Sequence, residues 1–97
     1  GSSIAYAVSK AGLIHLTRCM AVALGPEVLV NCIAPGYIEG TRISANLDPA
    51  HAKRAVATSA LKRATNKDDV ADQVIAFCRS DSTTGQTLAV DAGRFFH

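Results

Sequence analysis

The chain has 97 residues, which leaves room for one domain with a single core and too little chain for two. Hydrophobic residues make up 48% of it and charged residues 19%, a globular composition that excludes a disordered tail. The formal net charge is only +2, with Lys and Arg scattered along the chain, so charge points neither to nucleic acid nor to a membrane as a partner.

The first predicted element is one long helix from Ile4 to Leu24, whose apolar residues recur at steps of three and four. Ser2 or Ser3 could cap its start. Gly25-Pro26 should end it, because proline cannot continue a helix. We expect a soluble protein, since Gly, Pro, Asn or charged residues interrupt the longest apolar runs of the chain before the roughly 20 residues that span a bilayer.

Shorter elements follow the helix. The run from Val28 to Ile33 is dense in apolar and β-branched residues and predicts a buried strand. Residues 37–66 form a long excursion that contains a short helix at 49–58. A capped helix from Lys67 to Arg79 and a strand from Gln86 to Val90 complete the chain.

Helix, strand, helix, strand is the alternation of an α/β fold with a parallel sheet. Two strands alone leave their edges exposed and their faces poorly covered. We therefore expect the chain to be a fragment of a larger domain or to assemble with other chains.

The cysteines are Cys19, Cys32 and Cys78, an odd number without the short spacings of a zinc site or a disulfide framework. We predict buried free thiols in a reducing compartment, no metal site, and a cytoplasmic location.

Tyr6 and Lys10 lie four residues apart, which places both on one face of the first helix with Cβ atoms about 5–6 Å apart. A phenol can hand a proton to an oxygen or take one from it, and a nearby ammonium favours the phenolate. Taken alone, such a pair is most often an ordinary solvated one, so its chemical interpretation depends on the surrounding sequence.

Four segments give that context, because together they resemble the C-terminal portion of the short-chain dehydrogenase/reductase family. YAVSKA at 6–11 resembles the family's Tyr-x-x-Ser-Lys-Ala motif, and VNCIAPG at 30–36 its Val-Asn-x-Ile-x-Pro-Gly strand and loop. DDVA at 68–71 and TGQTLAVDAG at 84–93 are similar to the start of its penultimate helix and to its last strand. The general resemblance is to 3-oxoacyl reductases. It implies that residues 1–97 are the C-terminal part of one Rossmann-like, doubly wound parallel sheet.

The resemblance also implies an oxidoreductase that transfers a hydride between NAD or NADP and a small carbonyl or alcohol substrate. Tyr6 would be the acid/base at the substrate oxygen, assisted by Lys10, which would also hold the nicotinamide ribose. Pro35 and Gly36 would bring the backbone close to the nicotinamide carboxamide, and Ile38 would offer main-chain hydrogen bonds there.

Other positions receive smaller roles. Thr41 is a further cofactor candidate, although the family commonly has Thr one residue earlier, where this chain has Gly40. Residues 37–66 correspond to the substrate lid, in which we interpret His51 as a surface residue. Asn31 is expected to be structural, because a strand-end amide usually satisfies neighbouring backbone groups.

The glycine-rich turn, the Asn-Ala-Gly segment and the catalytic Ser that precede the Tyr motif in the family do not occur in these residues. An isolated 97-residue chain should therefore be weak or inactive as an enzyme, since the glycine-rich turn is the main anchor of the cofactor phosphates.

Several alternatives stay open. The chain could be a truncated, non-catalytic module that docks onto a full-length relative, or an isomerase or dehydratase on the same scaffold. The resemblance implies a homo-oligomer built through the long helix and the last strand. The choice between NAD and NADP depends on residues that these 97 do not include.

Overall fold

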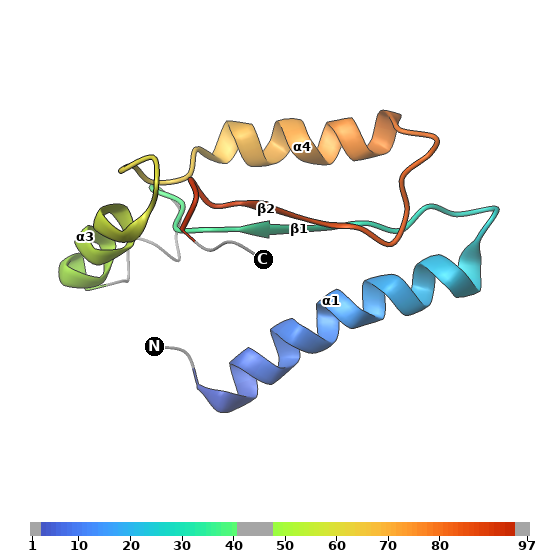
Figure 1. Cartoon of the computed structure of the whole chain (residues 1–97), viewed down its shortest axis with the longest axis horizontal. Coiled ribbons are helices and arrows are strands. Elements are labelled where there is room, and N and C mark those ends of the chain that lie inside the picture. Colours follow the sequence, from blue (N-terminus) through green and yellow to red (C-terminus); the bar gives the residue numbers. More distant parts are fainter. Residues whose placement is uncertain (1–2, 41–47, 95–97) are drawn as a thin grey trace. The chain divides into compact units, whose positions relative to one another are not determined.

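The computed structural model describes residues 3–40 and 48–94. Figure 1 shows the elements in chain order, which are α1 (Ile4–Leu24), β1 (Cys32–Pro35), α3 (Pro49–Thr58), α4 (Lys67–Arg79) and β2 (Thr87–Val90). All three predicted helices are confirmed with their predicted bounds.

The two strands form one parallel sheet. The N–H of Cys32 donates to the carbonyl of Gln86 at 2.9 Å, and the N–H of Gly36 donates to that of Val90 at 3.0 Å. Both partners advance by four residues in the same direction, which is the register of a parallel pair. This confirms the predicted α/β class with a parallel sheet.

The first strand starts later than the sequence predicts, at Cys32 and not at Val28. The residues before it are held by the turn ahead of β2. The N–H of Val30 donates to the Thr84 hydroxyl at 3.0 Å, and the carbonyl of Val30 accepts from the Gly85 N–H at 2.7 Å. A side chain takes the place of a ladder partner here, so the regular strand begins only after these contacts.

The chain divides into two compact units. Unit 1 comprises Gly1–Cys32 and Phe77–Leu88, and unit 2 comprises Ile33–Ala76 and Ala89–His97.

Within unit 1, Asn31 links the start of β1 to the segment that leads into β2. Its side-chain N–H donates to the Thr83 carbonyl at 2.9 Å, and its Oδ1 accepts from the Gln86 N–H at 3.2 Å. Both ends of the amide are thereby used to join segments that are more than 50 residues apart in sequence. The predicted structural role of Asn31 is confirmed.

Helix α1 is the longest element of unit 1 and buries little of its surface. Only Thr17 and Ala21 are buried along its 21 residues. Its large apolar side chains are largely exposed, with Ile4 at 85% and Val22 at 86%. Most of the apolar surface of α1, which a core helix would bury, is therefore exposed.

By length and composition α1 is also apolar enough to cross a membrane, with a mean hydropathy of 1.2 over its most apolar stretch. Its apolar runs are interrupted, as expected, by Lys10, Gly12, His15 and Arg18, but these residues are too few to lower the average below that level. Packed helices of soluble proteins meet the same criterion.

Unit 2 contains α3, and the residues just after this helix lie against the turn that follows β2. Asp48 caps α3 by accepting from the Ala50 N–H at 2.9 Å, and Ala55 is buried. After the helix, the N–H groups of residues 60 and 61 donate to the carbonyls of Gly93 and Ala92, both at 3.0 Å. These bonds fix the chain that follows α3 against the turn that follows β2.

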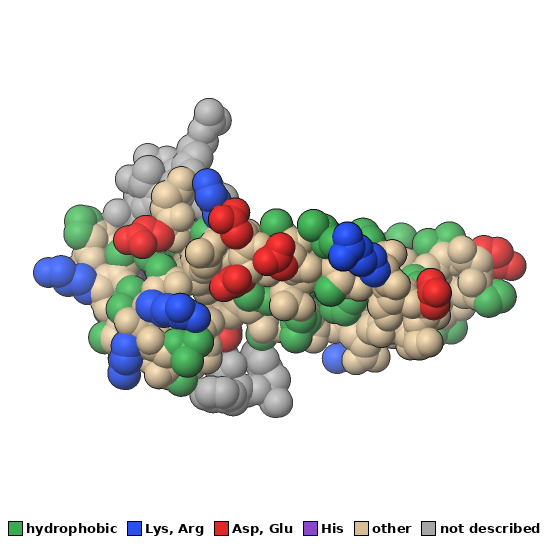
Figure 2. Space-filling view, turned by 90° about the horizontal axis from the view of Figure 1, so that it is seen from above, with side chains coloured by type: hydrophobic (Ala, Val, Ile, Leu, Met, Phe, Trp, Pro, Cys, Tyr) green, Lys and Arg blue, Asp and Glu red, His purple; other side chains and the backbone are tan. Residues whose placement is uncertain are grey.

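The three cysteines form no disulfide, and they are not buried as a group, contrary to the prediction from the sequence. Cys19 and Cys78 are exposed and Cys32 is half-buried. On the face drawn in Figure 2, acidic and basic side chains are interspersed with hydrophobic ones, in keeping with the scattered charge of the sequence.

Candidate active site

Tyr6 and Lys10 lie together near the start of α1. The ammonium Nζ of Lys10 sits over the Tyr6 ring, 5.3 Å from its centroid, in a cation–π arrangement. The Tyr6 side chain is 53% exposed, so it is not sealed in packing. The pair therefore presents a phenol and a cation side by side on one solvent-accessible helical face.

The backbone of Tyr6 is fixed by two serines. The Ser3 Oγ accepts a hydrogen bond from the Tyr6 N–H at 3.0 Å and caps the helix. The Ser9 Oγ donates to the Tyr6 carbonyl at 2.8 Å. Capping satisfies an N–H that the first turn would otherwise leave without a partner. The backbone that carries the Tyr6 side chain is therefore ordered.

The second group of predicted residues lies in unit 2, at and after the end of β1. Pro35 is the last residue of the strand, and Gly36 continues the ladder through its bond to Val90. Ile38 forms an isolated parallel bridge with Thr65. The structure thus brings Pro35, Gly36 and Ile38 into one ordered loop.

The space beside Gly36 is already filled. A Cβ at Gly36 would lie 2.7 Å from the Asp91 Cβ, 2.8 Å from the Asp91 Cα and 3.1 Å from the Thr65 Oγ1. Distances under 3.0 Å to backbone are not tolerated without movement. The side of Gly36 on which a side chain would stand therefore faces Asp91 and Thr65.

The other predicted positions are less informative. Thr41 lies outside the described residues. In the lid segment His51, which the sequence predicts to be a surface residue, is half-buried on α3.

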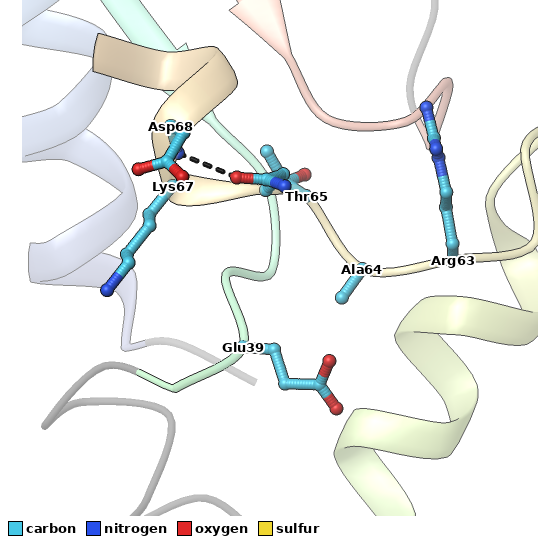
Figure 3. A pocket seen from close by; sticks show the side chains of 7 residues that line it. Glu39, Arg63, Ala64, Thr65, Lys67 and Asp68 are labelled. Carbon is cyan, nitrogen blue, oxygen red and sulfur yellow. Dashed lines mark hydrogen bonds between the residues drawn. The ribbon is translucent and has the colours of Figure 1, made fainter.

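Figure 3 shows a pocket of about 390 Å³ in unit 2, between the loop after β1 and the start of α4. Two cations and two carboxylates are among its lining residues, which are Glu39, Arg63, Ala64, Thr65, Asn66, Lys67 and Asp68. The dashed line marks the bond from the Asp68 N–H to the Asn66 Oδ1, 2.7 Å long, which caps α4. Tyr6 and Lys10 do not line this pocket, and its balanced charge selects no ionic ligand.

Thr65 is the residue that sequence reasoning missed. Its N–H donates to the Tyr37 carbonyl at 2.7 Å, and its side chain is buried beside Gly36. The sequence around Thr65 does not indicate this role, because the residues it contacts in space lie almost 30 positions earlier in the chain. Only the paired backbone reveals the contact.

Comparisons with known proteins agree with this fold. The family model described as enoyl-(acyl carrier protein) reductase matches residues 1–94. The chain is 44% identical over 95 residues to a putative ketoacyl reductase of the granaticin polyketide synthase from Streptomyces violaceoruber, covering 96% of this chain and 38% of that protein. It is 36% identical to the short-chain dehydrogenase/reductase homolog YusR of Bacillus subtilis, covering 97% of this chain and 71% of that protein.

Among solved structures, the chain is similar to a short-chain dehydrogenase from Leptospira borgpetersenii that was crystallised with bound NAD+. The TM-score is 0.87 at 31% identity, over 99% of this chain and 37% of that one. The chain thus spans well under half the length of the ketoacyl reductase and of this dehydrogenase, and most of the shorter Bacillus homolog.

Proposed function

Because the chain belongs to the short-chain dehydrogenase/reductase family, we propose that it is the C-terminal part of an NAD(P)-dependent oxidoreductase acting on a carbonyl or an alcohol. The ketoacyl reductase among its relatives supports a carbonyl substrate of the 3-oxoacyl kind. The dehydrogenase crystallised with NAD+ supports a nicotinamide cofactor. We also propose a cytoplasmic location, which the odd number and wide spacing of the cysteines favour.

The observation that carries the proposal is the placement of the Lys10 ammonium over the ring of a half-exposed Tyr6. A general acid must be reachable by substrate, and Tyr6 is. The Lys10 ammonium lies beside the ring and can also donate hydrogen bonds to a cofactor. The pair thus offers a reachable proton donor next to a hydrogen-bonding cation.

In the proposed reaction a bound nicotinamide would supply or accept the hydride. The hydroxyl of Tyr6 would give its proton to the substrate oxygen in reduction, or take that proton back in oxidation. Lys10 would hold the ribose of the nicotinamide nucleotide close to Tyr6.

Two separate parts of the chain, one in each unit, have groups whose chemistry suits a nicotinamide nucleotide. Lys10 is exposed and carries three N–H donors, which suit the hydroxyl groups of a ribose. The loop from Pro35 to Ile38 is ordered by backbone bonds, so it can present main-chain groups in a fixed direction. Either NAD or NADP is compatible with these contacts.

The test compares Tyr6→Phe and Lys10→Met with the unaltered full-length protein, using NADPH or NADH and a panel of ketones. Removing the phenolic proton should lower turnover by about 10²- to 10⁴-fold, the usual contribution of a general acid. Lys10→Met should weaken cofactor binding as well as turnover. Lys62→Met is the matched control, because the Lys62 ammonium bonds only the local Ala57 carbonyl at 2.7 Å among the interactions described for it.

Unchanged turnover in Tyr6→Phe, with circular dichroism showing the same helix content, would remove the basis of the proposal. Unchanged rate and cofactor affinity in Lys10→Met would remove the assigned role of the lysine alone.

A second candidate is a non-catalytic module that docks onto a full-length relative. The exposed apolar surface of α1 favours it, as does the Bacillus homolog, of which this chain covers 71%. The 97-residue chain alone should then oxidise no NADPH with any ketone, and it should co-sediment with a full-length relative. Steady NADPH oxidation by the chain alone, lost in Tyr6→Phe, would exclude this candidate.

A further inference from the structure

The loop that follows β1 is held from two sides within unit 2. On one side the Gly36 N–H donates to the Val90 carbonyl at 3.0 Å, and Gly36 lies against Asp91. On the other side the Thr65 N–H donates to the Tyr37 carbonyl at 2.7 Å. Residues 36–38 therefore lie between the end of β2 and the segment that leads into α4.

Thr65 makes the contacts that hold the loop on its second side. It pairs with Ile38 in an isolated parallel bridge, and its Oγ1 lies 3.1 Å from the position of a Cβ on Gly36. Its side chain is only 6% exposed. A residue of this size so close to the glycine leaves the loop little room to move toward α4.

The hydroxyl of Thr65 is buried and has no hydrogen-bond partner. An unsatisfied buried hydroxyl opposes folding, so it does not explain why a threonine side chain suits this position. The branched Cβ does, because it restricts the rotamers of the side chain and favours extended backbone. Valine has the same branched shape without the hydroxyl.

We propose that Thr65 is a positioning residue for the cofactor-facing loop, acting through its backbone N–H and its branched side chain to hold residues 36–38 against Asp91. This inference rests on the proposed function, which gives Pro35, Gly36 and Ile38 to the nicotinamide. In this role Thr65 acts through the loop and is not itself assigned a contact with cofactor or substrate. It sets the direction in which the loop presents its main-chain groups.

The test uses Thr65→Val and Thr65→Gly in the full-length protein, with NADPH and NADH as probes. Thr65→Val keeps the N–H and the branch, so the KM for the cofactor should stay within about twofold of the unaltered value. Thr65→Gly keeps the N–H but removes the branch and frees the backbone. Its cofactor KM should rise by about tenfold or more, with kcat at saturating cofactor changed by less than about threefold. Hydrogen exchange at the Thr65 amide should quicken in Thr65→Gly alone.

Thr87→Gly is the matched control. Thr87 also has a buried hydroxyl without a partner, but it lies at the start of β2 and contacts no part of the loop through the bonds described. A similar loss of stability with an unchanged cofactor KM is expected there. The inference is overturned if Thr65→Gly leaves the KM unchanged, if Thr87→Gly raises it equally, or if Thr65→Val raises it as much as Thr65→Gly. If the unaltered protein binds neither NADPH nor NADH, the proposed function itself fails, and this inference fails with it.

Discussion

Gly36 stands where no side chain fits. Its missing Cβ would lie within 2.8 Å of both the Cα and the Cβ of Asp91. Backbone atoms cannot swing aside as the end of a flexible side chain can, so the end of β1 and the turn after β2 can approach this closely only at a glycine. The packing of the two strand ends is thus a sufficient reason for the Pro-Gly pair, beside the cofactor approach that the family resemblance implies.

Gly36→Ala should therefore destabilise the protein by about 1–3 kcal/mol, the usual cost of forcing a methyl group into filled space. Gly12→Ala is the control, because nothing lies within 4 Å of its Cβ position on α1. That change should stabilise the protein by up to about 1 kcal/mol, since alanine is the better helix former. Urea denaturation of both variants checks the pair, and an equal effect at the two glycines would contradict the packing argument.

At the scale of the element, α1 combines a well-formed N-terminus with a sparsely buried body. Its cap, Ser3, accepts a hydrogen bond from the Tyr6 N–H, so the candidate acid lies within the capped first turn of the helix. At 100° per residue, Tyr6 and Lys10 share the stripe that carries the buried Thr17 and Ala21. Because Tyr6 belongs to the capped first turn, fraying of that turn would also displace the phenol.

Ser3→Ala should fray this turn and cost about 0.5–2 kcal/mol of stability, because the Tyr6 N–H loses its acceptor. Ser3→Asp should restore the turn, since its carboxylate caps equally well and is favoured at a helix N-terminus. Hydrogen exchange at the Tyr6 amide measures the fraying. Fast exchange in both variants, or in neither, would contradict the assigned capping bond.

At the scale of the whole molecule, the described residues bury very few side chains. The buried hydrophobic ones among them are Ala21 and Ala55, both small. Ile4, Val8 and Val22 occupy the face of α1 opposite to Tyr6 and are 85%, 65% and 86% exposed. An apolar helix face left in water is a surface that favours association, so the molecule should bind further protein there.

We accordingly expect the protein to self-associate through this face of α1, as the family resemblance suggests. The double variant Val8→Lys, Val22→Lys should shift sedimentation velocity toward the monomer at concentrations where the unaltered protein is a dimer or larger. Val28→Lys is the control, because it makes the same substitution at an exposed valine that lies after the helix. Oligomers that survive the double variant would place the interface elsewhere.

The sequence predicts much of the fold correctly because helices are local. The bounds of α1, α3 and α4 follow from apolar spacing and from capping residues within a few positions of each end. The pairing of Tyr6 with Lys10 is equally local, since residues four apart meet on any helix. The motifs and their order were sufficient to indicate the family, which the comparisons confirm.

Contacts between segments that are distant in the sequence could not be predicted from local patterns. The start of β1 depends on a hydroxyl more than 50 residues away, and the exposure of Cys19 and Cys78 depends on what packs against their helices. From the sequence alone came the helices, the parallel α/β class and the chemistry of the first turn. Only the tertiary structure decided why Gly36 must be a glycine and that Thr65 lies beside it, because burial and close approach are set by neighbours that the local chain does not contain.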